Sequence, residues 1–294
     1  MAPSVDGGVL QGKAVLITGG GSGIGKAAAL AATAAGAQVL ICGRRESALR
    51  EVADLCGAHI CAADLNQHGE PGRVVTQTVR RLGRIDGVVL NAGVMLDGSV
   101  LELTDQAWDT CVASNLSAPF RVARAALPHL LHTRGAVVSV SSVAALRSPT
   151  QAAGYASSKA GLSMLAHSIA VDFGPAGVRS NVVCPGWVRT EMADEEMRRF
   201  GAPLGLSVND AYTEITQLVP QRRSAEANEI AAAVVWLLSP QSSYVNGATL
   251  TVDGGASVVD AGTVPIQFAL APREAGRSSP EHREDRGGAM PQKV

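Results

Sequence analysis

The sequence predicts an α/β fold: a doubly wound, seven-stranded parallel sheet with helices on both faces, in a single domain. Short apolar runs alternate with longer stretches of helical period along most of the chain. The runs are apolar at successive positions, as expected for strands that are buried on both faces. Hydrophobic residues make up 46% of the 294 residues, which is enough for one large core. A parallel sheet covered on both sides by helices accounts for the alternation, for the runs apolar on both faces and for the high hydrophobic content.

The expected strands are seven apolar runs, at residues 14–18, 38–42, 59–64, 87–93, 136–142, 180–186 and 248–255. Helices are expected from Gly23, from about Arg45, from about Glu70, in a long segment through Ala125, from Ala153 and from Glu226. Residues 1–270 are predicted to form the domain. Residues 271–294 are rich in charge, Pro and Gly and are predicted to form a mobile C-terminal tail.

Composition excludes several classes of partner. The net charge of −1 creates no field that would attract nucleic acid or an anionic membrane. Five cysteines lack the paired spacing of a disulfide framework, and His129 and His132 have no nearby acids, so no metal site is predicted. No signal peptide or membrane span is found. We therefore expect a cytoplasmic protein with a small-molecule substrate.

A glycine-rich turn follows the first expected strand and leads into a helix of small residues. Glycines allow backbone N–H groups to approach a pyrophosphate, and the helix N-terminus favours its negative charge. Because a tight strand-to-helix turn needs Gly for steric reasons as well, the context of strand and helix is what supports a dinucleotide site. The residues expected to hold the dinucleotide are Thr18, Gly19, Gly21, Ser22, Gly23, Ile24 and Gly25.

The end of the second strand favours NADP over NAD. An NAD site would place an acid here to accept from the ribose 2′-hydroxyl, but Gly43 occupies the position and Arg44 and Arg45 follow. A guanidinium can make paired hydrogen bonds with a 2′-phosphate. Two solvated arginines at a helix start are the alternative, and Ser22 stands where a basic residue could have offered a second phosphate contact. NAD therefore stays possible.

Tyr155 and Lys159 form the candidate acid–base pair. They are four residues apart in a helical stretch, so their side chains share one face. A nearby ammonium is expected to lower the phenol pKa and make Tyr155 a general acid or base. Ser142 ends the fifth strand, at the sheet edge where ligands bind, and could polarise a carbonyl oxygen. Taken singly, Tyr155 and Lys159 could instead be a pair on a solvated helix face, and Ser142 could simply end a strand.

Together these motifs closely resemble the short-chain dehydrogenase/reductase family over roughly residues 10 to 258. The matching pieces are the TGGGSGIG turn, NAG at 91–93, YASSK at 155–159 and PGWVRT at 185–190. The resemblance implies a Rossmann fold and a nicotinamide cofactor. It adds to the expected cofactor site Asp64 and Leu65 at the adenine, Tyr155 and Lys159, and Asn91, Ala92, Gly93, Pro185, Gly186, Val188 and Thr190.

The resemblance also implies four catalytic roles, for Asn115, Ser142, Tyr155 and Lys159. In reduction, Tyr155 would give a proton to the carbonyl oxygen while Ser142 donates a hydrogen bond. Lys159 would hold the nicotinamide ribose, and Asn115 would anchor a water that relays protons. The family further implies a homotetramer, a dimer of dimers formed by the long helices before Ser142 and after Tyr155.

The substrate is expected under a lid at about residues 191–218. This segment is longer than a simple connection needs and mixes apolar with charged residues. The expected substrate contacts are Ser142, Tyr155, Ala144, Leu146 and Met192, which favour a mid-sized apolar molecule. Apolar lid residues that only pack on the body would look the same. Residues 207–220 resemble aromatic polyketide ketoreductases, over too short a stretch to imply a substrate.

Three functions remain open at this point. An NADP-linked ketone reductase or alcohol dehydrogenase is favoured. The alternative of an NAD-linked dehydrogenase of a secondary alcohol or steroid-like molecule is weakly disfavoured by Gly43 and Arg44. A non-catalytic dinucleotide-binding protein is strongly disfavoured by the complete set of four catalytic residues.

Overall fold

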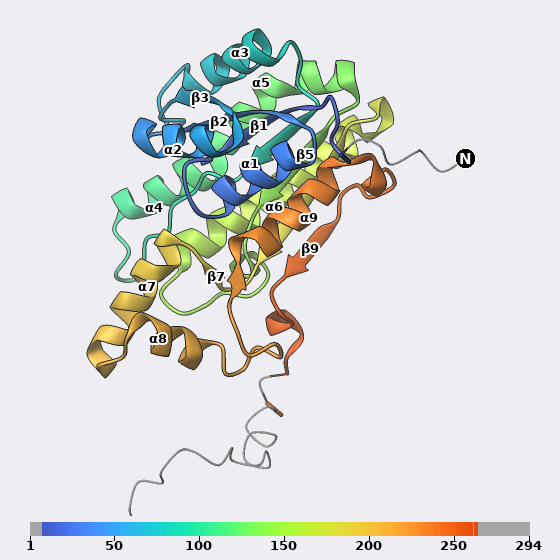
Figure 1. Cartoon of the computed structure of the whole chain (residues 1–294). Coiled ribbons are helices and arrows are strands. Elements are labelled where there is room, and N and C mark those ends of the chain that lie inside the picture. The colour runs from blue at the N-terminus through green and yellow to red at the C-terminus, as the bar shows by residue number, and fades with distance from the viewer. Residues whose placement is uncertain (1–7, 261, 264–294) are drawn as a thin grey trace, which may run out of the picture. The chain divides into compact units, whose positions relative to one another are not determined.

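The computed structural model describes residues 8–260 and 262–263, and its main element is a parallel sheet (Figure 1). The sheet has seven strands in the order β3-β2-β1-β4-β5-β6-β9. Their bounds are Ala14–Thr18 (β1), Gln38–Gly43 (β2), His59–Ala62 (β3), Gly87–Leu90 (β4), Ala136–Val140 (β5), Arg179–Pro185 (β6) and Thr249–Val252 (β9). All neighbouring pairs are parallel, which confirms the predicted seven-stranded, doubly wound sheet.

Helices cover both faces of the sheet and bury two separate cores. On one face lie α1 (Gly23–Ala34), α2 (Glu46–Cys56) and α9 (Ala227–Leu238), with α1 and α9 side by side in front of the strands in Figure 1. On the other lie α3 (Glu70–Leu82), α5 (Ala118–Thr133) and α6 (Ala153–Phe173). Alternate residues of β1 to β5 supply the two cores: in β1, Ile17 faces the first and Leu16 the second.

Strand order reverses between β1 and β4, and this reversal fixes the position of the site. The chain moves outward from β1 through β2 to β3, then returns to β4 on the opposite side of β1. The segments that follow β1 and β4 therefore diverge and leave a crevice at the carboxyl ends of the strands. The glycine turn after β1 and the Asn91–Gly93 segment after β4 border this crevice.

The long helix that was expected to run through Ala125 is divided. It begins as α4 (Asp105–Val112), passes through a π-helical turn at Ala113–Ser117 and continues as α5. A second departure is a small two-stranded sheet, β7 (Val188–Arg189) with β8 (Ala225–Glu226), which the sequence patterns did not predict. Wide π turns are frequent at functional sites, and this one contains Asn115.

The segment predicted as a lid forms two helices with a core of their own. They are α7 (Glu191–Gly201) and α8 (Val208–Ile215), joined through a 3₁₀ turn at Ala202–Leu204 (Figure 1). Thr190 and Ser207 cap their N-termini by accepting hydrogen bonds from Ala193 N and Asp210 N. Between them are buried Ala193, Met197, Ala211 and Tyr212.

Contacts divide the chain after Val259. The first unit, residues 1–259, contains the whole sheet. Of the second, the structure describes residues 260 and 262–263, where Thr263 N donates to Asp260 O. The predicted tail, 271–294, lies outside the described residues, and the tail and the boundary at 270 stay predictions. In the described part of the chain, no helix is both long and apolar enough to cross a bilayer.

Leu16→Ala is expected to lower the free energy of unfolding by roughly 2–5 kcal/mol, because it opens a cavity beneath a central strand. Leu16 is fully buried, whereas Leu55 on α2 is 63% exposed and supplies a matched control. Leu55→Ala should change stability by less than about 0.5 kcal/mol. Urea titration of both variants measures the difference, and equal midpoints would contradict the described core.

Candidate active site

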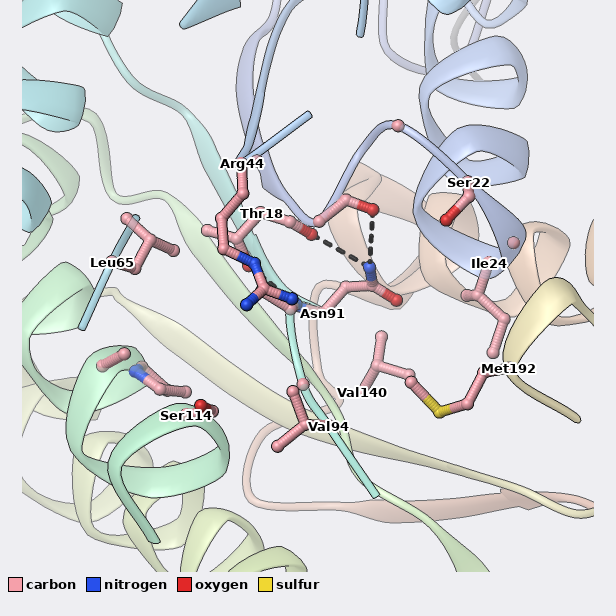
Figure 2. Close-up of a pocket in the computed structure, with 18 of the residues that line it drawn as sticks. Thr18, Ser22, Ile24, Arg44, Leu65, Asn91, Val94, Ser114, Val140 and Met192 are labelled. Carbon is pink, nitrogen blue, oxygen red and sulfur yellow. Dashed lines mark hydrogen bonds between the residues drawn. The ribbon is translucent and has the colours of Figure 1, made fainter. Parts of the chain in front are cut away.

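A cavity of about 600 Å³ occupies the crevice at the carboxyl ends of the strands (Figure 2). Its size is that of a site for a small ligand or cofactor. Most of the predicted cofactor residues line it: Thr18, Gly19, Gly21, Ser22, Gly23, Ile24, Arg44, Arg45, Asp64, Leu65, Asn91, Ala92, Gly93, Tyr155, Lys159 and Thr190, together with Met192 from the lid. The structure thus brings together residues separated by up to 174 positions in the chain, from Thr18 to Met192.

The glycine turn is shaped by close approaches. Gly19 and Gly23 have φ of +68° and +53°, a region that side chains disfavour. A Cβ at Gly19 would lie 2.8 Å from Asn91 Nδ2. Gly25 does not line the cavity, in contrast to its predicted cofactor role. A Cβ there would lie 2.1 Å from the Gly19 carbonyl oxygen, so Gly25 lets α1 pack against the turn.

Thr18 and Asn91 hold the two sides of the crevice together (Figure 2). Asn91 Nδ2 donates to the carbonyl oxygens of Thr18 (2.9 Å) and Gly19 (3.2 Å). Thr18 Oγ1 accepts from the backbone N–H groups of Asn91 (2.9 Å) and Ala92 (3.1 Å). The shape of the glycine turn is therefore tied to the end of β4.

The two arginines after β2 differ in their surroundings. Arg44 extends from the end of β2 into the cavity in Figure 2, and among the described residues no hydrogen bond or ion pair involves it. Arg45 Nη2 donates to Glu191 Oε2 on the lid (2.9 Å) and to Ser22 Oγ (3.3 Å). Both arginines were predicted for a 2′-phosphate, but the guanidinium of Arg45 already has an acidic partner.

Asn115 is fully buried in the π turn and cross-links three segments. Its Oδ1 accepts from Val94 N (2.8 Å), and its Nδ2 donates to Val94 O (2.9 Å) and to Ser158 Oγ on α6 (3.0 Å). A Cβ at Gly93 would lie 2.9 Å from Asn115 Oδ1 and 3.3 Å from Lys159 Nζ. Only glycine leaves both side chains undisturbed at that position.

Lys159 and Tyr155 are neighbours on α6, as predicted. Lys159 is buried, and its Nζ donates to Val140 O at the end of β5 (2.9 Å). Burial lowers the pKa of Lys159 to about 8, because a charged ammonium loses hydration there. At neutral pH the group is still mostly protonated.

The expected lowering of the phenol pKa by Lys159 is not observed. Burial raises the pKa of Tyr155 to about 12, a hydrogen bond with Ser142 lowers it, and the charge of Glu196 raises it further. The Lys159 ammonium lies over the tyrosine ring, 5.8 Å from its centre, and donates to a backbone carbonyl instead. In this structure Ser142, rather than Lys159, is the neighbour that lowers the phenol pKa.

Ser142 and the predicted substrate wall lie beside the large cavity rather than in its lining. Ser142 Oγ accepts from Ala144 N (3.1 Å) and caps the 3₁₀ turn at Val143–Ala145. Ala144 is buried and Leu146 is half exposed. The placement of Ala144 and Leu146 in a substrate pocket therefore stays a prediction, whereas Met192 points into the cavity from the lid (Figure 2).

Besides Gly25, three predicted cofactor residues do not line the cavity: Pro185, Gly186 and Val188. Pro185 ends β6 beside Val252, and Val188 pairs with Ala225 in the small sheet. A Cβ at Gly186 would lie 2.9 Å from Asp253. This segment positions Thr190, which does reach the cavity.

Sequence reasoning missed several residues of the site. Val94, Ser114 and Val140 line the cavity, and Asn66 Nδ2 donates to Ser114 Oγ (2.9 Å). Their signal in the sequence was only their place next to Gly93, next to Asn115 and at the end of a strand. No group of three or more His, Cys, Asp or Glu side chains within 8–260 and 262–263 could hold a metal ion.

Glu196 on α7 is a further residue that the motifs did not indicate. It is one turn beyond Met192, so both lie on the same face of the lid helix, although only Met192 lines the cavity. Burial and the nearby Asp97 raise the pKa of Glu196 to about 7, and Arg199 lowers it. Arg199 Nη1 is itself paired with Asp97 Oδ2, at 2.5 Å. A partly protonated carboxyl therefore lies near Tyr155.

Comparisons with known proteins agree with this geometry. The family model described as enoyl-(acyl carrier protein) reductase matches residues 19–257. Protein MoaE of Klebsiella aerogenes is 41% identical, over 86% of this chain and 98% of that protein. Meso-2,3-butanediol dehydrogenase of Serratia marcescens is 35% identical, over 84% of this chain and 96% of that protein.

Solved structures of a reductase and a ketoreductase are also similar to this chain. Levodione reductase superposes with a TM-score of 0.80 at 33% identity, covering 85% of this chain and 100% of the other. A variant of actinorhodin polyketide ketoreductase, solved with NADPH, superposes with a TM-score of 0.80 at 30% identity, covering 84% of this chain and 98% of the other. The activities named for the butanediol dehydrogenase, the levodione reductase and the ketoreductase are dehydrogenation or reduction.

Asp97→Asn is expected to lower the pKa of Glu196 toward the usual carboxyl range. The change removes a repelling charge and frees Arg199, and both effects favour the ionised carboxylate. Carboxyl ¹³C chemical shifts followed over pH 5–9 measure this, with Glu196→Gln to assign the signal. Asp109→Asn, an exposed change on α4, is the control. An unchanged pKa would mean that burial alone sets it.

Proposed function

The chain belongs to the short-chain dehydrogenase/reductase family of oxidoreductases, and we propose that it is an NADP(H)-dependent ketone reductase or secondary-alcohol dehydrogenase. The observation that carries the proposal is the joining of a glycine-lined cavity to Tyr155 and Lys159. A dinucleotide placed along the glycine turn would end beside a proton-exchanging phenol. That arrangement is the one a hydride-transfer enzyme requires.

The residues present fit a nicotinamide dinucleotide. At Gly19, Gly21 and Gly23 the turn presents backbone without a side chain to the cavity, and the N-terminus of α1 would supply a site for the pyrophosphate. Asp64 and Leu65 line the part of the cavity next to β3 and would flank the adenine. Gly43 offers no acid to a ribose 2′-hydroxyl, and Arg44 extends a guanidinium without a partner among the described residues. These features favour NADP(H), a preference that the NADPH-bound ketoreductase relative also supports.

The bound nicotinamide would supply or accept a hydride at the carbonyl carbon. In the direction of reduction, Tyr155 Oη would give its proton to the carbonyl oxygen, and the Ser142 hydroxyl would donate a hydrogen bond to the same oxygen. A phenol pKa of about 12 keeps Tyr155 protonated at neutral pH, as a proton donor must be. Lys159, with a pKa of about 8, would return a proton to this site. Asn115 keeps α4, α6 and the Val94 segment in register.

We further propose a mid-sized apolar substrate that carries no negative charge. Met192 supplies an apolar contact from the lid, and Ala144 and Leu146 would form the opposite wall. The carboxyl of Glu196 would repel a carboxylate or phosphate brought close to Tyr155. Meso-2,3-butanediol and levodione, the compounds in the names of two relatives, are likewise uncharged.

A second candidate is an NAD-linked alcohol dehydrogenase. The ion pair of Arg45 with Glu191 favours it, because one of the two arginines expected at a 2′-phosphate is already paired. Titration of the purified protein with NADPH and with NADH, followed by fluorescence, discriminates the two. Tighter binding of NADH would move the assignment to this alternative, and binding of neither would favour a non-catalytic role.

We propose a homotetramer formed through the helices on the α5 and α6 side. Trp108, Phe120, Met164 and Val171 are large apolar side chains on α4, α5 and α6 that are 42% to 75% exposed. If these side chains form one contiguous apolar patch, that patch would mark a protein interface. Light scattering of the purified protein tests the assembly. The cytoplasmic location stays a prediction from the sequence.

Tyr155→Phe is expected to lower kcat at least about a hundredfold, because it removes the hydroxyl that exchanges the proton. Binding of the dinucleotide should stay nearly unchanged, since the glycine turn and Arg44 are untouched. The readout is the absorbance of the reduced nicotinamide with a panel of apolar ketones. Tyr244→Phe, at a fully exposed tyrosine, is the control. Near-normal turnover in the Tyr155 variant would mean that another group is the acid.

Arg44→Ala is expected to weaken NADPH binding by roughly tenfold or more while changing NADH binding little, because a charge-assisted hydrogen bond to phosphate is worth about 1.5–3 kcal/mol. Arg50→Ala, on the exposed part of α2 and outside the cavity, should change neither affinity. Equal losses for both dinucleotides would show that Arg44 does not read the 2′-phosphate.

A further inference from the structure

We propose that Glu191, the first residue of the lid helix α7, weakens the preference of this protein for NADP(H) by competing with the 2′-phosphate for Arg45. The inference rests on the proposed function, because it concerns the dinucleotide that the cavity would hold. Glu191 lies outside the catalytic set and outside the motifs expected to bind the dinucleotide. The competition also explains why an arginine expected at a phosphate is already paired.

The contacts place the acid at the phosphate end of the cavity. Glu191 Oε2 accepts from Arg45 Nη2 at 2.9 Å, and the same nitrogen donates to Ser22 Oγ at 3.3 Å. All three residues line the cavity together with Arg44. A Cβ at Gly23 would lie 3.1 Å from Thr190 Cγ2, so the start of the lid directly adjoins the glycine turn. Glu191 thus lies beside the glycine turn and the segment after β2, the two elements that would enclose a 2′-phosphate.

Local structure holds Glu191 in place. Thr190 caps α7 by accepting from Ala193 N (3.2 Å), which fixes the direction of the first turn. An acid in the first turn of a helix is stabilised by the helix dipole. If Arg45 turned to a phosphate, Glu191 would therefore lose little more than the exposed ion pair.

Competition follows from the geometry of the guanidinium. A phosphate next to Arg44 and Ser22 would need a hydrogen bond from Arg45 Nη2. That nitrogen now donates to Glu191 Oε2. A 2′-phosphate would also meet the negative charge of Glu191 at close range. The side chains of Arg45 and Glu191 are 62% and 69% exposed, so the pair is held weakly and can exchange partners. The acid lowers the affinity for the 2′-phosphate without abolishing it, and leaves a 2′-hydroxyl unaffected.

The test is Glu191→Gln in the full chain, with NADPH and NADH affinities measured by fluorescence titration. The change keeps the shape of the side chain and the Thr190 cap while removing the charge. NADPH should bind roughly three- to tenfold more tightly, the range expected when an exposed ion pair and a like-charge contact are both removed. NADH affinity should change less than about twofold. Glu195→Gln, an exposed acid on the same helix paired with Arg198, is the matched control.

Two further arms isolate the phosphate and the arginine. Competition against bound NADPH measures the affinity for adenosine 2′,5′-bisphosphate and for ADP. Glu191→Gln should raise the affinity for the bisphosphate by the same factor as for NADPH and should leave the affinity for ADP unchanged. In an Arg45→Gln background the gain should shrink to the part that comes from repulsion alone.

Equal gains for NADPH and NADH, or equal gains from Glu191→Gln and Glu195→Gln, would overturn the inference and leave the proposed function standing. If the unchanged chain binds no dinucleotide at all, the proposed function fails, and the inference fails with it. A selective gain for ligands that carry the 2′-phosphate supports both.

Discussion

The site depends on the hydrogen bonds that Thr18 and Asn91 make across the reversal of strand order. A parallel sheet opens a crevice wherever successive connections leave in opposite directions, but nothing in that topology fixes the shape of the glycine turn. Here the Asn91 amide holds two carbonyls of the turn, and the Thr18 hydroxyl accepts from the segment after β4. The turn, the cavity and the Gly93 segment that makes room for Lys159 and Asn115 are thereby built as one unit.

Burial governs the chemistry of the catalytic residues more than their neighbours do. Lys159 and Tyr155 lose hydration against the end of β5, which lowers the pKa of the amine and raises that of the phenol. Both shifts favour the neutral forms, as low polarity does for any isolated charge. The phenol is therefore suited to giving a proton in reduction. Glu196, brought in by the lid, acts in the same sense by disfavouring negative charge on Tyr155.

The lid is packed as a small unit of its own, and two ion pairs join it to the body. Its interior holds Met197 and Tyr212, and the Arg189 guanidinium lies 3.9 Å from the centre of the Tyr212 ring. The two ion pairs are Glu191 with Arg45, which lies at the cavity, and Arg199 with Asp97, which does not line it. Exposed ion pairs exchange partners at low cost. The side chains that join the lid to the body could therefore also bind a charged ligand.

The sequence by itself determined the fold and most of the cofactor cavity, because both follow from local patterns. Apolar runs fixed the seven strands, and the glycine turn and the Tyr155–Lys159 spacing are readable within a few residues. Tertiary structure alone decided the division of the helix at Asn115, the withdrawal of Pro185, Gly186 and Val188 from the cavity, and the pairing of Arg45 with Glu191. It also decided the direction of the Tyr155 pKa shift. Desolvation and contacts between residues 146 positions apart depend on what the rest of the chain places around a side chain, and no short pattern contains that information.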